Sequence, residues 1–207
     1  TVPSLVRVKV SASWVSLAQL LYDFPELGDV EQMMKYLDNG RAADQPRAEL
    51  LLGKLYYEGK WVPADAKAAQ AHFQKAQGQE VAADYYLGQI YRRGYLGQVY
   101  SQKALDHLLT AARNGQNSAD FAIAQLFSQG KGTRPDPLNA YVFSQLAKIQ
   151  DTPQAKELAA QLEQQLPPAQ RAEGQRLLQQ ELAARGALSQ STLQLHALQE
   201  EDGEESL

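Results

Sequence analysis

Apolar, small and polar positions follow one another in the same order in three stretches of this chain. The stretches are residues 48–59 (AELLLGKLYYEG), 83–94 (ADYYLGQIYRRG) and 119–130 (ADFAIAQLFSQG). Their first alanines are separated by 35 and then by 36 residues. Repetition at a nearly fixed step of this size predicts a stack of helix-turn-helix units.

Three positions of the repeated pattern explain how such units would pack. A small residue lets neighbouring helices approach closely, an aromatic residue fills the space beside it, and a glycine ends the helix in the left-handed conformation. The small residues are Gly53, Gly88 and Ala124, the aromatic residues are Tyr56, Tyr91 and Phe127, and the terminal glycines are Gly59, Gly94 and Gly130. Glycine inside a helix costs about 1 kcal/mol relative to alanine, so its recurrence at one position predicts a packing requirement.

Each stretch is the first helix, here called helix A, of a two-helix repeat. The apolar spacing predicts helices A at residues 46–58, 81–93 and 118–129, and helices B at residues 65–77, 101–114 and 137–149. In the helices B, Ala68, Ala104 and Ala140 are spaced by 36 residues, and the same step aligns Phe73 with Leu109. No repeat can bury its apolar face alone, so the repeats are expected to stack.

The N-terminal part of the chain departs from the repeat pattern. Residues 1–12 alternate valine with polar residues, which predicts a β-strand or the remnant of an upstream element. Residues 13–45 predict an atypical helical repeat, whose first helix would begin after an N-cap at Ser13 and stop at Pro25. The expected inward stripe of that helix is Trp14, Leu17, Leu20, Leu21 and Phe24.

The C-terminal part keeps the period but becomes more polar. A leucine stripe predicts a helix that ends at Pro167, and residues 169–184 predict a last helix that stops at Gly186. The stripe consists of Leu158, Leu162 and Leu166. A polar last repeat is what a solenoid needs at its end, so residues 151–186 are predicted to be a capping repeat. Residues 187–207 are predicted to be an acidic, flexible tail with one short turn of helix.

The sequence therefore predicts an all-α protein, an α-solenoid of stacked repeats. Its predicted segments are residues 1–12 (N-terminal segment or upstream remnant), 13–45 (atypical repeat), 46–80, 81–116 and 117–150 (repeats), 151–186 (capping repeat) and 187–207 (tail). The chain has 207 residues, of which 44% are hydrophobic, and its mean hydropathy is −0.45. These values fit a folded, soluble protein, and no apolar run approaches the ~20 residues that a membrane span needs.

Composition and charge exclude several classes of function. The chain contains no cysteine, which excludes disulfides, thiol catalysis and thiolate-bound metals. Five acids crowd residues 200–205, and without them the formal charge of −4 becomes +1. A nearly neutral body argues against nucleic acid as the partner, because phosphate binding needs a concentrated basic surface. The chain opens at Thr1 without a basic or apolar leader, so we expect a processed chain or a fragment.

The loop and helix B of the third repeat indicate a family. Residues 130–144 read GKGTRPDPLNAYVFS, and the pairs Lys67-Ala68 and Lys103-Ala104 continue the pattern. They resemble Sel1-like repeats, a subtype of the tetratricopeptide repeat. The resemblance covers residues 46–186 and implies an α-solenoid that binds proteins. The second repeat reads GYLG at residues 94–97 where the family has GxG, so a rearranged loop is expected there.

A second resemblance is more specific. The runs QNSADFAIAQLFSQGKG (116–132), AYVFSQLAK (140–148), PPAQRAEGQRL (167–177) and the ending LQLHALQEEDGEESL resemble scaffold lipoproteins of bacterial alginate secretion. This resemblance implies a periplasmic scaffold at the outer membrane. Its implied partners are the alginate acetyltransferase AlgX and the export porin AlgE. It also implies a lipid anchor on an N-terminal cysteine, a residue type that this sequence does not contain.

No catalytic or cofactor-binding pattern stands out. The chain lacks HExxH, GxSxG and phosphate-loop motifs, so no catalytic, metal or cofactor residue is predicted. His72 and His107 lie in helices B and are expected at repeat interfaces, and His196 lies in the tail. Asp84 and Asp120 recur at equivalent positions, which the repeats explain without paired acid and base chemistry.

Exposed positions of helix A are the better functional candidates. Tyr57, Arg92 and Arg93 are the predicted partner-binding residues, because tyrosine and arginine most often anchor interfaces. Two alternatives stay open: the arginines cap the end of their helix, and Tyr86 packs in the repeat core. The leading hypothesis is a non-enzymatic scaffold that binds proteins. The second is direct binding of a polyuronate by Arg92, Arg93 and nearby lysines, and a third, an enzyme of unknown type, has no supporting feature.

Overall fold

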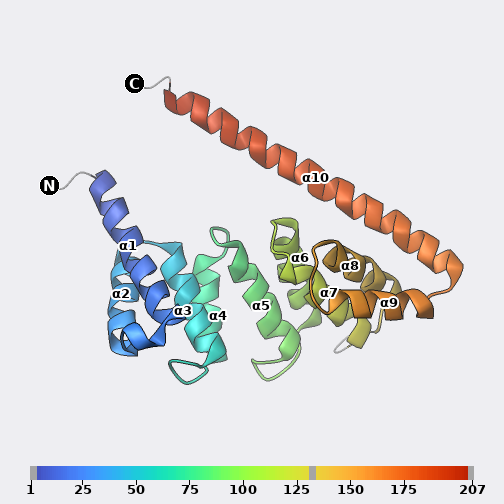
Figure 1. The fold of residues 1–207 in the computed structure, drawn as a ribbon, viewed down its shortest axis with the longest axis horizontal. Coiled ribbons are helices and arrows are strands. Elements are labelled where there is room, and N and C mark those ends of the chain that lie inside the picture. Colours follow the sequence, from blue (N-terminus) through green and yellow to red (C-terminus); the bar gives the residue numbers. More distant parts are fainter. Residues whose placement is uncertain (1–3, 131–133, 205–207) are drawn as a thin grey trace. The chain divides into compact units, whose positions relative to one another are not determined.

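The computed structural model of the protein describes residues 4–130 and 134–204, with side chains described from residue 14 to residue 186 except 131–133. In these residues the chain forms α-helices and one 3-10 helix, without a β-strand (Figure 1). The helices are α1 (Ser4–Asp23), η1 (Pro25–Leu27), α2 (Val30–Ala42), α3 (Pro46–Glu58), α4 (Ala66–Ala76), α5 (Val81–Arg93), α6 (Ser101–Arg113), α7 (Ser118–Gln129), α8 (Pro137–Ile149), α9 (Ala155–Gln165) and α10 (Pro168–Glu204).

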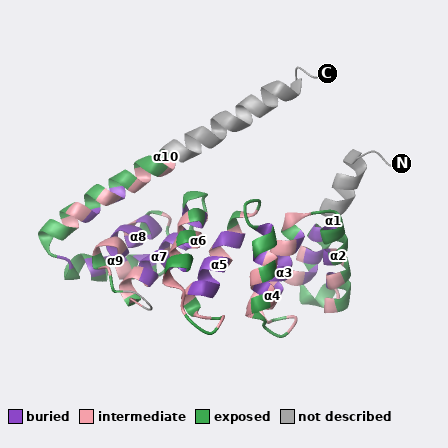
Figure 2. Cartoon of the chain, turned by 180° about the vertical axis from the view of Figure 1, so that it is seen from behind, coloured by how far each residue is buried: buried purple, intermediate pink, exposed green. Residues whose placement is uncertain are grey.

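The chain divides into two compact units, Thr1–Ala111 and Ala112–Leu207. In the first unit α1 packs on α2, and α3 packs on α4, which also contacts α5. In the second unit α8 packs on α7 and is contacted by α9 and α10. Buried residues recur on the helices of both units, and α5 and α8 are buried over most of their circumference (Figure 2). This arrangement confirms the predicted all-α repeat fold. None of the helices in the described part is both long and apolar enough to cross a bilayer.

Two glycines of the helices A lie where no side chain fits. A Cβ at Gly53 would lie 2.5 Å from Cε1 of Phe73, and a Cβ at Gly88 would lie 2.6 Å from Cγ of Leu108. Both partners belong to helix B of the same repeat, and both are fully buried. The small position of the pattern is therefore the close approach between the two helices of one repeat, as its recurrence predicted.

The glycines that end the helices A take up the left-handed conformation, as predicted. The backbone angle φ is 67° at Gly59, 72° at Gly94 and 59° at Gly130. The amide of each glycine donates to a carbonyl of the last helical turn, namely Leu55, Ile90 and Leu126. These caps satisfy carbonyls that a helix end would otherwise leave without partners.

One backbone hydrogen bond closes all three loops between helices A and B. It runs from the amide of Asp65 to the carbonyl of Tyr56 (2.9 Å), from Tyr100 to Tyr91 (3.0 Å) and from Asp136 to Phe127 (2.9 Å). The GYLG loop at residues 94–97 thus closes with the same bond as its equivalents. Its departure from the family pattern changes the side chains that the loop presents while preserving this closure.

The predicted N-terminal strand is wrong where the structure describes it. α1 begins at Ser4, so Val6, Val8 and Val10 lie in a helix and Ser13 is an interior residue of it. Each residue added to an existing helix gains a hydrogen bond, whereas a strand without a neighbouring strand gains none. Helix propagation therefore overrides the local alternation. Residues 1–3 of that prediction lie outside the described residues.

The inward face of α1 also differs from the predicted stripe. The buried residues are Val15, Ala18 and Leu21. Leu17, Leu20 and Phe24 expose 38%, 44% and 49% of their surface. Ala18 precedes Gly53 by one 35-residue step, so α1 obeys the rule of the other helices A. The prediction followed the large residues, although the repeat places a small one against its partner helix.

Helix B of the first repeat aligns one residue later than predicted. Its buried alanine is Ala69, not Ala68, and Phe73 corresponds to Leu108, not to Leu109. The alanines buried in the three helices B are Ala69, Ala104 and Ala140. The step between the first two repeats is therefore 35 residues in helix B as in helix A, whereas the prediction used 36 for both steps of helix B.

α10 continues past the predicted stop. It runs through Gly186 to Glu204, so the predicted end at Gly186 and the single short turn within residues 187–207 are both wrong. A glycine costs a helix only about 1 kcal/mol, and the residues after it are rich in alanine, leucine and glutamine, which are good helix formers. The leucine stripe of α9 is as predicted, since Leu162 and Leu166 are buried against α8.

Candidate functional site

An aromatic and cationic cluster lies on the first unit. α3 provides Tyr57, α5 provides two tyrosines and two arginines, and the loop after α5 provides Tyr95. The six residues are Tyr57, Tyr85, Tyr86, Arg92, Arg93 and Tyr95, which we call the tyrosine–arginine cluster. The cluster brings together Tyr57, Arg92 and Arg93, the three partner-binding residues predicted from the sequence.

The rings of the cluster rest on the core of the repeat. Tyr86 stacks on the fully buried Phe73, with ring centroids 4.9 Å apart and the planes at 3°. The ring centroid of Tyr57 lies 5.2 Å from that of Tyr86, in an edge-to-face arrangement. It lies 5.8 Å from the ring centroid of Tyr95, with the two planes tilted. Tyr95 is 46% exposed, whereas Tyr57 and Tyr86 are half-buried. Tyr86 therefore links the core to an accessible aromatic surface.

A buried amide positions the first arginine. Nε of Arg92 donates to Oε1 of Gln89 at 2.8 Å, and Nε2 of Gln89 donates to the hydroxyl of Tyr85 at 2.8 Å. Gln89 is only 5% exposed, so its buried amide holds the side chains of Arg92 and Tyr85 in place. Nη1 of Arg93 donates to the hydroxyl of Tyr95 at 3.2 Å. Both guanidinium groups are thus held by neutral side chains, in the last turn of α5.

The two arginines carry positive charge without a carboxylate partner among the described side chains. Burial lowers the pKa of Arg92, and repulsion from Arg93 lowers it further. The hydrogen bond to Tyr95 raises the pKa of Arg93. A guanidinium stays charged at any physiological pH. Two adjacent, partly desolvated charges with neutral partners therefore form a site that an anionic group can complete.

The hydroxyls of Tyr57 and Tyr86 stay protonated at neutral pH. Burial raises the pKa of Tyr57, and it raises the pKa of Tyr86 to about 12. A neutral hydroxyl can both donate and accept a hydrogen bond, and the ring beside it offers an apolar face. The cluster can therefore recognise a ligand group that combines negative charge, hydroxyls and a flat apolar surface.

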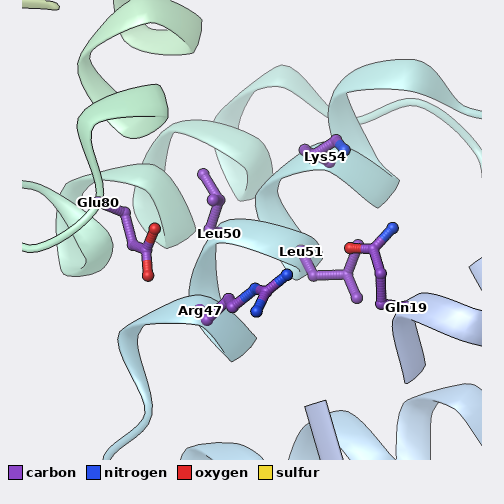
Figure 3. A pocket seen from close by; sticks show the side chains of 6 residues that line it. All are labelled: Gln19, Arg47, Leu50, Leu51, Lys54 and Glu80. Atoms are coloured by element: carbon purple, nitrogen blue, oxygen red, sulfur yellow. The ribbon is translucent and has the colours of Figure 1, made fainter. Parts of the chain in front are cut away.

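A shallow hollow opens beside α3, between α1 and the residue before α5 (Figure 3). Its volume is about 430 Å³. The lining residues are Gln19, Arg47, Leu50, Leu51, Lys54 and Glu80. Nζ of Lys54 lies 5.0 Å from the centroid of the Tyr22 ring. The lining mixes both signs of charge, because Glu80 accompanies Arg47 and Lys54. The tyrosine–arginine cluster is therefore the stronger candidate for an anion.

The described histidines have structural roles. Nδ1 of His72 lies 2.6 Å from Oε2 of Glu49, and Nδ1 of His107 lies 2.8 Å from Oδ1 of Asp84. Each pair joins helix A to helix B of one repeat. No group of three or more histidine or acidic side chains suited to a metal occurs in the part of the chain whose side chains are described. His196 lies outside that part.

Sequence reasoning missed three members or supports of the cluster. Tyr85 and Gln89 are one turn apart on α5, and only the structure shows that their side chains meet. Tyr95 lies in the loop that departs from the family pattern, which is a sequence signal for a changed surface. That signal could not show that the hydroxyl of Tyr95 accepts a hydrogen bond from Arg93.

Comparison with known proteins places the chain in a family. Sel1 repeats match residues 46–76, 81–116 and 117–160, which is more than half of the chain. The chain therefore belongs to the Sel1 repeat family, a class of repeat proteins built from helix pairs.

Solved structures share the fold. A protective antigen of uropathogenic Escherichia coli with an SLR fold aligns over 89% of this chain and 40% of its own, at 23% identity and a TM-score of 0.73. A Sel1 repeat protein from Oxalobacter formigenes aligns over 73% of this chain and 62% of its own, at 21% identity and a TM-score of 0.64. At these identities the likeness concerns the fold alone.

Curated relatives are similar over nearly the whole chain, and each is named alginate biosynthesis protein AlgK. The relative from Pseudomonas syringae pv. tomato is 68% identical over 94% of this chain and 42% of its own length. Those from Pseudomonas aeruginosa and Azotobacter vinelandii are 59% and 54% identical, over 92% and 87% of this chain and 40% and 39% of their own. These matches confirm the predicted resemblance. The chain spans about two fifths of the length of these relatives.

Proposed function

We propose that this chain is a non-enzymatic protein-binding scaffold of an alginate modification and export complex, in the periplasm at the outer membrane. The observation that carries the proposal is 68% identity to a protein named for alginate biosynthesis, over 94% of the chain, in a Sel1 repeat fold. Stacked helix pairs present extended surfaces to other proteins. The tyrosine–arginine cluster supports the proposal, because contacts within the chain already order its side chains.

The proposed partners are the acetyltransferase AlgX and the porin AlgE, and the proposed contact surface is the tyrosine–arginine cluster. Tyrosine and arginine dominate interface energetics when they are half-buried and rigid before binding. Arg92 and Tyr57 meet both conditions through Gln89 and Tyr86. A partner carboxylate would complete the site, because the hydrogen-bond partners of both guanidinium groups are neutral.

Binding measurements with single-surface variants test this proposal. The chain is immobilised, and AlgX and AlgE are passed over the wild type, Tyr57→Ala and a double variant Arg92→Ala with Arg93→Ala. The double variant should lose at least roughly tenfold in affinity for its partner, which is about 1.4 kcal/mol. The matched control is Arg176→Ala, which removes an exposed arginine of α10 paired with Glu173. Equal losses in control and cluster variants would exclude the cluster as the contact surface.

A second candidate function is direct binding of a polyuronate by the same cluster. The observation in its favour is the pair of arginines without a carboxylate, beside tyrosine rings that suit the apolar face of a sugar. Each uronate carries one carboxylate and several hydroxyls, which guanidinium and phenol groups recognise. The near-neutral charge of the chain outside residues 200–205 makes this candidate the weaker of the two.

Calorimetry with defined alginate oligomers separates the two candidates. Polymer binding predicts heat with the oligomer, an affinity that falls steeply with added salt, and loss in the Arg92→Ala, Arg93→Ala variant. A neutral glucan oligomer of equal length is the control. Heat from the glucan, or none from alginate at low salt, rules against polymer binding without touching the protein-scaffold proposal.

A further inference from the structure

Each of the three regular repeats carries an acid at the second residue of its repeated stretch, and the structure pairs each acid with a base. The acids are Glu49, Asp84 and Asp120. In the first two repeats the base is a histidine of helix B in the same repeat. Nδ1 of His72 lies 2.6 Å from Glu49, and Nδ1 of His107 lies 2.8 Å from Asp84. The acid and the base thereby fasten the two helices of one repeat together.

An aromatic stack accompanies each of these pairs. His72 stacks on Tyr56 with centroids 5.7 Å apart, and His107 stacks on Tyr91 at 5.5 Å. In the third repeat Phe143 takes the position of the histidine and stacks on Phe127 at 6.0 Å. The stack is conserved within the chain, but a phenylalanine has no nitrogen to offer to Asp120.

Asp120 takes its base from α10 instead. Nη2 and Nη1 of Arg185 donate to the two carboxylate oxygens of Asp120 at 2.7 and 2.9 Å. Asp120 is fully buried, and the side chain of Arg185 is 14% exposed. A buried, bidentate pair of this kind is strong and directional, and removal of one partner leaves the other as an uncompensated buried charge.

Glu181 extends this pair into a network of four charges. It accepts hydrogen bonds from Nε and Nη2 of Arg113 at 3.0 and 3.1 Å, and from Nε of Arg185 at 3.1 Å. We call Arg113, Asp120, Glu181 and Arg185 the arginine clasp. The clasp ties α10 to α7 and to the last residue of α6. Two arginines and two carboxylates balance, so the clasp is neutral as a whole.

The beginning of α10 is held in a different way. Nε2 of Gln175 donates to the hydroxyl of Tyr141 at 2.6 Å, and a Cβ at Gly174 would lie 2.7 Å from Cδ1 of that ring. Leu178, one turn after Gly174 on the same helix, is buried. From there to Gly186 the apolar contribution is small, because Leu182 is the one large apolar side chain and is only half-buried. Charge, not apolar burial, dominates the docking of this second part.

We propose that the arginine clasp is a releasable lock that decides whether the second part of α10 is docked on the third repeat. When the clasp opens, residues 179–186 leave α7, and Asp120 is uncovered. The first part of α10 stays on Tyr141. In the first two repeats the acids pair instead with histidines of their own helices B, and Glu49 also accepts a hydrogen bond from Arg41 of α2. This inference concerns the second unit and is independent of the proposed function.

Hydrogen exchange of the full chain, followed by mass spectrometry, tests the lock. Arg185→Ala should accelerate exchange of the amides at residues 179–186 by roughly tenfold or more, while the first unit exchanges as in the wild type. Arg176→Ala is the matched control, because it removes an exposed arginine of the same helix and should change nothing there. Unchanged exchange at residues 179–186 in Arg185→Ala overturns the proposal.

A second variant separates a lock from a general structural role. Phe143→His in the Arg185→Ala background restores the internal acid–histidine pair of the other repeats. The protection of α7 and α8 should then recover, while residues 179–186 stay released. Recovery of protection at residues 179–186 as well overturns the proposal, because the stability of the repeat and not the clasp would then hold α10.

Discussion

Gly88 of α5 faces Leu108 of α6 at a distance that admits no side chain, since a Cβ there would lie 2.6 Å from Cγ of Leu108. The two helices of the second repeat can pack at this spacing only because the position is glycine. Arg92 lies one turn further along the same helix. The packing of α5 on α6 therefore also fixes the helix that carries the arginines of the candidate site.

Gly88→Ala should destabilise the protein by about 1–2 kcal/mol. Overpacking of a core costs about 1–3 kcal/mol, and alanine returns up to about 1 kcal/mol of helix propensity. Urea unfolding followed by circular dichroism measures the difference. The matched control is Gly186→Ala, where a Cβ meets nothing within 4 Å, and which should be neutral or stabilising. Destabilisation of both variants by the same amount contradicts the account of the small position.

His107→Phe should destabilise the second repeat by about 1–3 kcal/mol, because it leaves the buried Asp84 without one of its hydrogen-bond partners. The phenyl ring keeps the stack on Tyr91, as Phe143 does in the third repeat. The loss therefore reports the polar pair and not the packing.

A double-mutant cycle with Asp84→Ala checks this assignment. The double variant should cost less than the two single losses together, because removal of the acid leaves no buried group without its partner. The free energies of unfolding come from urea titrations at neutral pH. Simple additivity of the two losses contradicts a direct interaction between the side chains.

Glu49 should make the stability of the protein depend on pH in the acid range. Burial raises the pKa of Glu49, but hydrogen bonds from His72 and Arg41 outweigh burial, and the net pKa lies below the ordinary value of 4.5. A carboxylate of this kind stabilises the fold fully above its unfolded pKa, and the stabilisation is lost as pH falls through the folded pKa. The free energy of unfolding should therefore decline once the pH drops below 4.5.

The variant Glu49→Gln isolates this contribution, because an amide does not titrate. Urea unfolding from neutral pH down to about pH 3 should show a shallower decline for the variant than for the wild type. Both proteins retain His72 and Arg41, so the comparison changes only the side chain of Glu49. Parallel profiles of variant and wild type would remove Glu49 as the source of the acid sensitivity.

The repeat itself could be predicted from the sequence because its rules are local. The left-handed helix end could be predicted at Gly94 because glycine adopts that backbone conformation readily. The close helix contact could be predicted at Gly88 because a small residue recurs there in each repeat. The alignment of helix B was wrong by one residue in the first repeat, since a single step of 35 is hard to place among similar alanines. The helix end predicted at Gly186 was wrong, because the helix propensity of the neighbouring residues exceeds the modest cost of one glycine.

The candidate site was predicted only as far as residue type and helix position allow. Tyr57, Arg92 and Arg93 were predicted from their expected exposure on helix A, and the structure places them in one cluster, with Tyr57 and Arg92 half-buried. The bond from Arg92 to Gln89 and the contribution of Tyr95 depend on side-chain packing that no period encodes. The pairing of Asp120 with Arg185 joins residues 65 positions apart and was equally beyond the sequence.

The central claim is that this chain binds a protein partner of the alginate machinery through the tyrosine–arginine cluster. The most direct measurement is size-exclusion chromatography of the chain with purified AlgX at tens of micromolar of each protein. The account predicts a complex that elutes ahead of either component and that dissociates when Arg92 and Arg93 are both replaced by alanine. Separate elution of the two wild-type proteins at that concentration would contradict it.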